Sequence, residues 1–183
     1  VLPQEIGNLS SLQLFRCDDN QLTTLPKEIG NLTALKSFNC SYNQLSTLPK
    51  EIGNLTSLQI FACFYNQLTT LPNEIGNLTL LQTFHFSHNQ LTSLPNEIGN
   101  LVLLKKFECS HNQLIALPNQ IIQLRNLICI CHHSNPIKYM SPILQRFLNN
   151  LRKNHNNIYN DKQNVHNHEI QSSISQSINN ILN

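Results

Sequence analysis

A phrase of 23 residues recurs along the chain, and no other feature constrains its fold as strongly. The phrase reads L-x-x-F-x-C-x-x-N-Q-L-x-x-L-P-x-E-I-G-N-L, and its first asparagine returns every 23 residues. The six positions are Asn20, Asn43, Asn66, Asn89, Asn112 and Asn135. Because self-similarity at a fixed period is the signature of stacked repeats, we expect six units in a row, each packed only against its neighbours.

Each unit combines a strand pattern with a helical-turn pattern. Phe38 and Cys40 alternate with polar residues in the manner of a short strand whose apolar side faces a core. The segment 48–55, LPKEIGNL, opens near a proline and ends on Gly53-Asn54, which is typical of a short helix. The pattern therefore predicts six parallel strands, with Ile52 facing the same core from the opposite side.

These residues resemble the leucine-rich repeat family in its 23-residue intracellular form, LPxEIGNLxxLxxFxCxxNQLTx, over residues 2–139. The resemblance implies an α/β fold: a right-handed solenoid with a parallel sheet on its concave face and short helical or 3-10 segments on its convex face. It also implies that the six asparagines form a structural ladder. Each side chain would lie buried after a strand and bond backbone groups of its own and neighbouring units.

The regular array is expected to span residues 1–139, and a C-terminal capping helix is expected over 140–153. In the sixth unit, His132 occupies the position that holds Cys or Phe elsewhere, and Pro136 follows the asparagine. Ser141 is a suitable N-cap for the helix and Pro142 suits its first turn. One apolar stripe should cover the open end of the array; it consists of Ile143, Leu144, Phe147, Leu148 and Leu151.

The last 30 residues divide into two segments. Residues 154–168 are polar and rich in asparagine, which predicts a loop, and residues 169–183 predict an amphipathic helix. The apolar positions of that helix are Ile170, Ile174, Ile178, Ile181 and Leu182. Two interpretations stay open: the helix folds back on the capping helix, or it begins a further domain or binds a partner.

Four of the six cysteines occupy one repeated apolar position, which Phe86 fills in the fourth unit. They are Cys17, Cys40, Cys63 and Cys109. Since Cys and Phe share the position, we expect buried, reduced thiols and hence a cytoplasmic location, although strands ~4.8 Å apart do not exclude disulfides by distance. No signal peptide is visible, but the sequence begins inside the repeat phrase, so we expect residues upstream of Val1.

Charge narrows the classes of partner. The chain is 40% apolar and 12% charged, with a net charge of +2. This balance requires neither nucleic acid nor a membrane, and no segment approaches the roughly 20 apolar residues of a membrane span. We expect a monomer that binds another protein.

The outward positions of the predicted strands differ between units, whereas the inward positions stay constant. Variable exposed residues on a constant scaffold are typical of a binding surface, so we predict that a partner protein binds the concave face. Ile60, Ala62 and Phe64 should form its exposed apolar centre. The full set of predicted contacts is Tyr42, Ile60, Ala62, Phe64, Tyr65, His85, His88, Glu108 and His111.

Two other functions remain as alternatives. His85, Glu108 and Cys131 share one column and are ligand types that zinc takes, but parallel columns point side by side, so solvated histidines and an attraction between His85 and Glu108 are preferred. A metal- or redox-responsive module could use the residues near the end of the array, namely Cys129, Cys131, His132 and His133. The chain could also be the recognition part of a longer multidomain protein.

Catalysis has little support in the sequence. Cys131 and His133 lack an orienting third group and an oxyanion donor. We expect no enzymatic activity, no cofactor and no metal.

Overall fold

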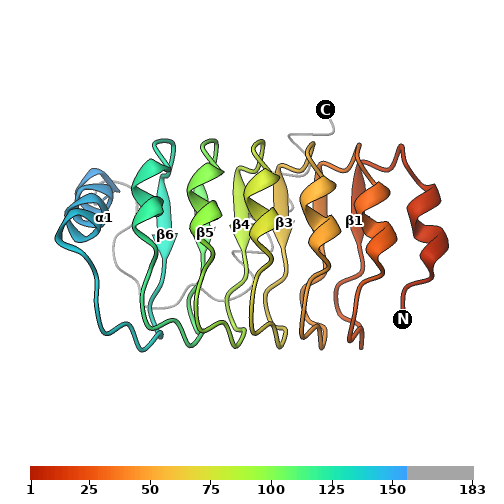
Figure 1. Cartoon of the computed structure of the whole chain (residues 1–183), viewed down its shortest axis with the longest axis horizontal. Helices are drawn as coiled ribbons and strands as arrows, with labels where there is room; N and C mark the ends of the chain where they lie inside the picture. The colour runs from red at the N-terminus through yellow and green to blue at the C-terminus, as the bar shows by residue number, and fades with distance from the viewer. Residues whose placement is uncertain (156–183) are drawn as a thin grey trace.

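The computed structural model describes residues 1–155, which form a single row of coils (Figure 1). Each coil contains one strand and one 3-10 helix. The strands are β1 (Leu14–Arg16), β2 (Ser37–Asn39), β3 (Ile60–Ala62), β4 (Thr83–His85), β5 (Lys106–Glu108) and β6 (Cys129–Cys131). The 3-10 helices are η1 (Gln4–Asn8), η2 (Lys27–Asn31), η3 (Lys50–Asn54), η4 (Asn73–Asn77), η5 (Asn96–Asn100) and η6 (Asn119–Gln123).

The strands form one parallel sheet in chain order, β1 to β6. Phe38 is in register with Phe15 on one side and with Phe61 on the other, so each step across the sheet equals one 23-residue period. The 3-10 helices follow the same order along the opposite side of the coil (Figure 1). The solenoid with a parallel sheet and short 3-10 segments is therefore confirmed.

The core is a set of ladders in which one residue type repeats from unit to unit. Phe38 and Phe61 stack with ring centroids 5.4 Å apart and planes 4° apart, and Phe61 stacks on Phe84 in the same way. In the fourth unit Phe86 fills the cysteine position and lies 4.6 Å from Phe84. Phe84 then meets Phe107 at 6.2 Å and 43°, so the larger side chain ends the parallel stack.

Each 3-10 helix begins after a proline and approaches the next helix closely at its glycine. Pro49 precedes η3 in an extended conformation, so it lies just outside the first turn. A Cβ placed on Gly53 would lie 2.5 Å from the backbone oxygen of Glu74 and 2.7 Å from the Glu74 Cβ. Glycine is therefore required here by the close packing of η3 on η4.

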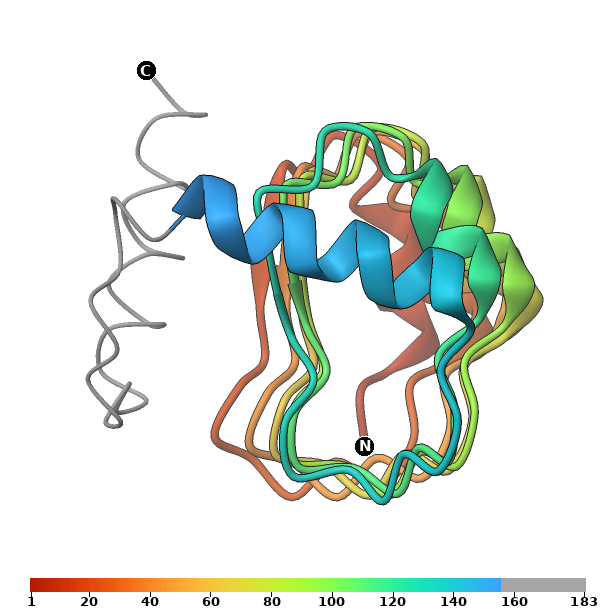
Figure 2. The same cartoon turned by 90° about the vertical axis from the view of Figure 1, so that its left-hand side faces the viewer.

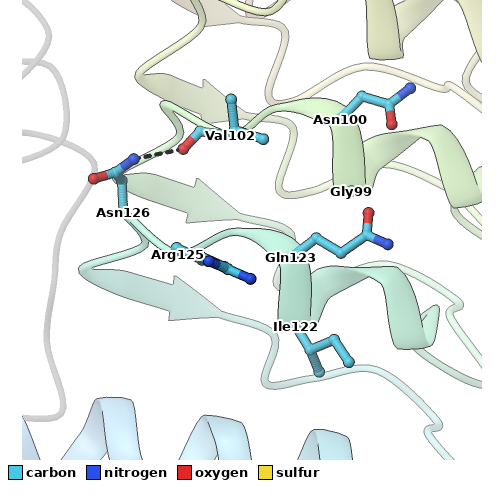
Figure 3. A pocket seen from close by; sticks show the side chains of 7 residues that line it. All are labelled: Gly99, Asn100, Val102, Ile122, Gln123, Arg125 and Asn126. Carbon is cyan, nitrogen blue, oxygen red and sulfur yellow. Dashed lines mark hydrogen bonds between the residues drawn. The ribbon is translucent and has the colours of Figure 1, made fainter.

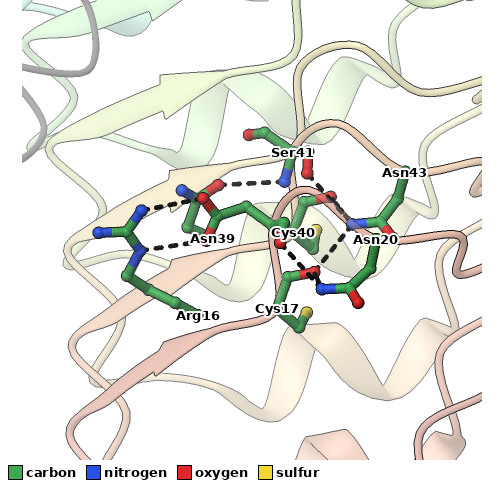
Figure 4. Close-up of polar contacts among 8 residues, drawn as sticks. Arg16, Cys17, Asn20, Asn39, Cys40, Ser41 and Asn43 are labelled. Atoms are coloured by element: carbon green, nitrogen blue, oxygen red, sulfur yellow. Dashed lines mark hydrogen bonds and ion pairs between the residues drawn. The ribbon is translucent and has the colours of Figure 1, made fainter.

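From the second unit onward, the asparagine side chain of each turn bonds to backbone groups of two units (Figure 4). The Asn43 Nδ2 donates to the carbonyl oxygens of Cys17, Cys40 and Ser41 at 2.9, 3.1 and 3.1 Å. Its Oδ1 accepts from the Leu22 N–H at 2.9 Å. The same four-bond pattern recurs at Asn66, Asn89, Asn112 and Asn135.

An α-helix, α1 (Pro142–His155), closes the C-terminal end of the array. The Ser141 Oγ accepts a hydrogen bond from the Leu144 N–H, as an N-cap does. Leu144 and Leu148 are buried in the core cluster. Ile143, predicted to share this stripe, is instead 58% exposed, because the helix face that meets η6 and β6 is centred on Leu144 and Leu148.

Near the C-terminus, the boundaries of the helix in the structure differ slightly from the predicted ones. The helix continues to His155, two residues past the predicted end. The rest of the predicted polar loop and the predicted helix at 169–183 lie outside the described residues. Within residues 1–155, no helix is long and apolar enough to cross a membrane.

Candidate functional site

The concave side of the array carries the residues that differ from unit to unit. Each three-residue strand turns its middle side chain, such as Phe61, into the core and its two outer side chains to the opposite face. Viewed along the array, the strands and the 3-10 helices lie on opposite sides of the coil (Figure 2). The predicted contact residues therefore share one side of the molecule, although their environments differ.

The predicted apolar centre is buried, which corrects the expectation that it is exposed. Ile60, Ala62 and Phe64 are 2%, 0% and 1% exposed, and together form a second apolar cluster separate from the main core. The Tyr42 and Phe64 rings pack edge to face with centroids 5.2 Å apart, and His85 stacks on Phe64 at 4.1 Å. Phe64 thus contacts aromatic rings of both adjacent units, which sequence alternation alone does not reveal.

His85 was expected to be solvated, and the structure shows the opposite. Its side chain is 2% exposed, and its Nδ1 has no hydrogen-bond partner. Burial, and secondarily the charge of His88, lowers the His85 pKa to about 3. His85 is therefore a neutral aromatic ring stacked on Phe64 at neutral pH.

Glu108 bonds to a cysteine and not to His85. Although His85 and Glu108 are in register, the Cys131 thiol hydrogen-bonds to the Glu108 carboxyl group. Burial raises the pKa of Glu108, while this hydrogen bond and the charges of Lys106 and His133 oppose the shift. The predicted attraction between His85 and Glu108 is wrong because His85 stays uncharged.

Four of the predicted contact residues form a continuous ladder of rings beside the buried cluster. We call Tyr42, Tyr65, His88 and His111 the ring ladder. Successive ring centroids are 4.8, 4.0 and 4.1 Å apart, with planes within 10° of parallel. The first three side chains are half-buried and His111 is exposed, so the ladder presents one edge to solvent.

The backbone holds the ring ladder in a conformation that is uncommon for residues other than glycine. All four have φ between 51° and 54°, in the left-handed region. Each stands immediately before the asparagine of its turn, whose four hydrogen bonds fix the local backbone. The repeated turn thus places one ring per unit at the equivalent position after its strand. The spacing of parallel strands then brings the rings of successive units into contact.

The histidines of the ladder are held toward the neutral form. Burial, followed by the charges of His111 and His133, lowers the His88 pKa, and burial with the charge of His133 lowers the His111 pKa. His133 meets the His111 ring edge-on at 5.1 Å. The sequence did not predict that His133 joins this group, because it lies one residue earlier in its unit than the ladder residues do.

The cysteines near the end of the array are poor candidates for redox or metal chemistry. Cys129 and Cys131 are free and half-buried. Burial and the Glu108 charge raise the Cys129 pKa to about 11 and raise that of Cys131 as well. Because the thiolate is the reactive and ligating form, both are suppressed at neutral pH, and no three His, Cys, Asp or Glu of the described part converge on a possible metal position.

A shallow hollow of about 710 Å³ lies on the convex side between η5 and η6 (Figure 3). It lies where the sixth unit departs from the repeat, with Ile122 in the position of the glycine. The Asn126 Nδ2 donates to the Val102 carbonyl oxygen at 2.7 Å across its edge. Its lining is Gly99, Asn100, Val102, Ile122, Gln123, Arg125 and Asn126. One cation and no other charged group line it, so it offers little to a ligand.

Two family models match the chain. A model described as a leucine-rich repeat region matches residues 1–84, and one described as a leucine-rich repeat matches residues 80–101. No curated protein matches the sequence at a significant level.

Several solved structures share the fold. A leucine-rich repeat protein of Leptospira interrogans is 35% identical, with a TM-score of 0.63 over 82% of this chain and 44% of that chain. The plant peptide hormone receptor RGFR1, in complex with RGF2, is 34% identical, with a TM-score of 0.70 over 74% of this chain and 23% of that chain.

A third structure is the leucine-rich repeat ectodomain of the membrane receptor kinase GASSHO1/SCHENGEN3 from Arabidopsis thaliana, in complex with CASPARIAN STRIP INTEGRITY FACTOR 2. It is 34% identical, with a TM-score of 0.68 over 73% of this chain and 17% of that chain. The present chain spans less than half the length of each of these three proteins.

Proposed function

The chain belongs to the leucine-rich repeat family, and we propose that it is a non-enzymatic module that binds another protein on its concave side. Two structural neighbours are leucine-rich repeat receptors in complex with RGF2 and with CASPARIAN STRIP INTEGRITY FACTOR 2. These complexes support a binding role for an array of this kind. In a longer protein, the array would be the recognition part.

The ring ladder is the observation that carries this proposal. Partly exposed aromatic side chains are the groups that most often dominate protein interfaces. Here stacking and a fixed backbone hold the rings in place, so little side-chain entropy remains to be lost when a partner binds. The ladder is uncharged at neutral pH, which favours partner segments that supply aromatic, proline or arginine side chains.

The proposal assigns different roles to the predicted contact residues. Tyr42, Tyr65, His88 and His111 make direct contacts. Ile60, Ala62, Phe64 and His85 support the ladder from below, because Phe64 contacts both tyrosines. Glu108, at the end of β5, is half-buried and is the charged residue at the edge of this surface.

The test is a selection of binding peptides from a displayed random library with the full 183-residue chain as bait. The selected peptides are then titrated against two tyrosine variants of the chain. Tyr65→Ala removes a ladder ring, whereas Tyr139→Ala removes an exposed tyrosine that lies outside the ladder. Loss of one aromatic anchor is worth about 2 kcal/mol, so we expect Tyr65→Ala to weaken binding by roughly 10-fold or more and Tyr139→Ala to leave it unchanged.

The opposite pattern would contradict the proposal. Equal affinity of wild type and Tyr65→Ala for every selected peptide would place binding elsewhere. The melting temperature of each variant is the control for folding.

A further inference from the structure

The ring ladder changes its chemistry along its length. The second and third units place Tyr42 and Tyr65 at the ladder position, whereas the fourth and fifth place His88 and His111 there. Tyrosine stays neutral at and below neutral pH, but histidine gains a proton in mild acid. One half of the surface that the proposed function uses can therefore acquire charge.

The histidines of this half contact one another. The His88 and His111 rings stack face to face, with centroids 4.1 Å apart and planes 10° apart. The His111 and His133 rings meet edge to face at 5.1 Å. Backbone bonds hold both stacked residues, since the His88 N–H donates to the Ser110 carbonyl oxygen and the His111 N–H to that of His133. Repulsion between these rings is therefore relieved by rotation of their side chains.

Burial and like charge both oppose protonation of the stacked pair. His88 is half-buried and lies between Tyr65 on one face and His111 on the other. Burial, followed by the charges of His111 and His133, lowers the His88 pKa. Burial and the charge of His133 lower the His111 pKa, and the buried His85 also senses the charge of His88. The pair is therefore neutral and stacked at neutral pH, and a second positive charge in it meets repulsion from the first.

Two carboxyl groups lie near the ends of the ladder. Glu108 interacts with His133 and also with Lys106. Asp19 occupies the ladder position of the first unit and interacts with Tyr42. Both carboxyl groups therefore act on the margins of the ladder and not on its stacked histidine pair.

We propose that the histidine half of the ring ladder is a pH-sensitive switch that binds uncharged or basic partner segments at neutral pH and releases them in mild acid. This proposal rests on the function proposed above. Protonation converts the stacked pair into two like charges 4.1 Å apart, so the rings rotate apart and the surface becomes positive. The partner then loses a preformed aromatic surface and, where it is basic, also meets repulsion.

The switch is tested by the ratio of two dissociation constants. A selected peptide that contains no histidine, aspartate or glutamate is titrated against the full chain at about pH 7.5 and about pH 5. We expect binding to be at least about 10-fold weaker in acid, the loss that follows when one aromatic anchor is displaced. The variant His88→Tyr/His111→Tyr keeps a ring at each position, as the second and third units do, and should lose this pH dependence.

A matched control replaces a histidine away from the ladder. His132→Phe introduces the residue that the fourth unit carries at the same core position, Phe86, and should keep the wild-type ratio. Melting temperatures at both pH values verify that each variant is folded. Equal weakening of wild type and His88→Tyr/His111→Tyr in acid, or no weakening of wild type, would overturn the switch. Either result leaves the proposed function standing, because the Tyr65→Ala comparison tests that function separately at neutral pH.

The coupling between the rings is tested without a partner. In an NMR titration of the histidine ring signals, His88 and His111 should titrate below the ordinary 6.5. His133→Gln should raise both midpoints, because it removes a neighbouring positive charge. Midpoints that stay unchanged in His133→Gln would show that the histidines titrate independently, which also overturns the switch.

Discussion

At the scale of single residues, the turn asparagine joins each unit to the one before it. The Asn66 Nδ2 donates to the carbonyl oxygens of Cys63 and Phe64 in its own unit and of Cys40 in the preceding unit. Its Oδ1 accepts from the Leu45 N–H of the preceding unit. The Asn20 side chain makes only two hydrogen bonds, both within its own unit, and the residue is exposed. One residue type at one position therefore stabilises the array to different extents along its length.

Replacement of Asn66 by alanine should lower the free energy of unfolding by at least about 1–3 kcal/mol, the cost of leaving a buried backbone group unpaired. Asn20→Ala is the matched control and should cost less than half as much, because Asn20 is exposed and makes fewer hydrogen bonds. Urea unfolding of the two variants measures the difference. Equal losses would contradict a stabilising role that depends on the preceding unit.

Gly53 gives a second prediction at this scale. Its φ is not positive, so alanine there would normally favour a helix. The close approach of Glu74 reverses the sign, and we expect Gly53→Ala to destabilise the protein by about 1–3 kcal/mol. The exposed neighbour Asn54, changed to alanine, should alter the melting temperature little; a stabilised Gly53→Ala variant would show that η3 and η4 separate easily.

His85 makes stability depend on pH in a defined direction. Its folded pKa of about 3 lies below the ordinary 6.5, so the unfolded chain binds more protons between these values. The stabilisation is complete above about pH 6.5 and is lost as the pH falls toward 3. His85→Phe cannot titrate, and its melting temperature should fall less than that of wild type between pH 7 and pH 4; parallel falls would mean that His85 is accessible to solvent.

At the scale of elements, α1 protects the open end of the last coil. Leu144 and Leu148 enter the core cluster between η6 and β6. The helix pattern predicted this element and its N-cap, because both depend on neighbouring residues. It did not predict which side of the stripe faces inward, because that depends on the angle at which the helix crosses the array.

The cap can be tested with two adjacent residues. Leu144→Ala should cost about 2–5 kcal/mol, since it leaves a cavity in the core, whereas Ile143→Ala on the exposed side should cost less than about 0.5 kcal/mol. Thermal unfolding monitored by circular dichroism distinguishes them. If Ile143→Ala destabilises the protein as much as Leu144→Ala, the orientation of α1 is different.

At the scale of the whole molecule, the 23-residue period predicted most of the architecture. A constant spacing with constant apolar positions allows one solution, in which each unit packs on identical neighbours. The same pattern also predicted that Phe64 and His85 lie on the sheet face opposite the core. It could not predict their burial, because alternation specifies a face and carries no information about the exposure of the side chains on it.

The candidate site was predictable only in part for the same reason. The variable columns located Tyr42, Tyr65, His88 and His111 on one side of the array. Their stacking depends on the left-handed backbone before each asparagine, and residues other than glycine adopt that conformation only uncommonly. The ring ladder is therefore a property of the repeated turn and becomes visible only in three dimensions.

The central claim is that partners bind on the concave side, beside the strands. Its most direct test is an NMR titration of the isotope-labelled full chain with a selected peptide ligand. We predict chemical-shift changes centred on Tyr65, His88 and His111, with none in the hollow around Gly99 and Arg125. Changes centred on that convex hollow, with an unperturbed ring ladder, would contradict the account.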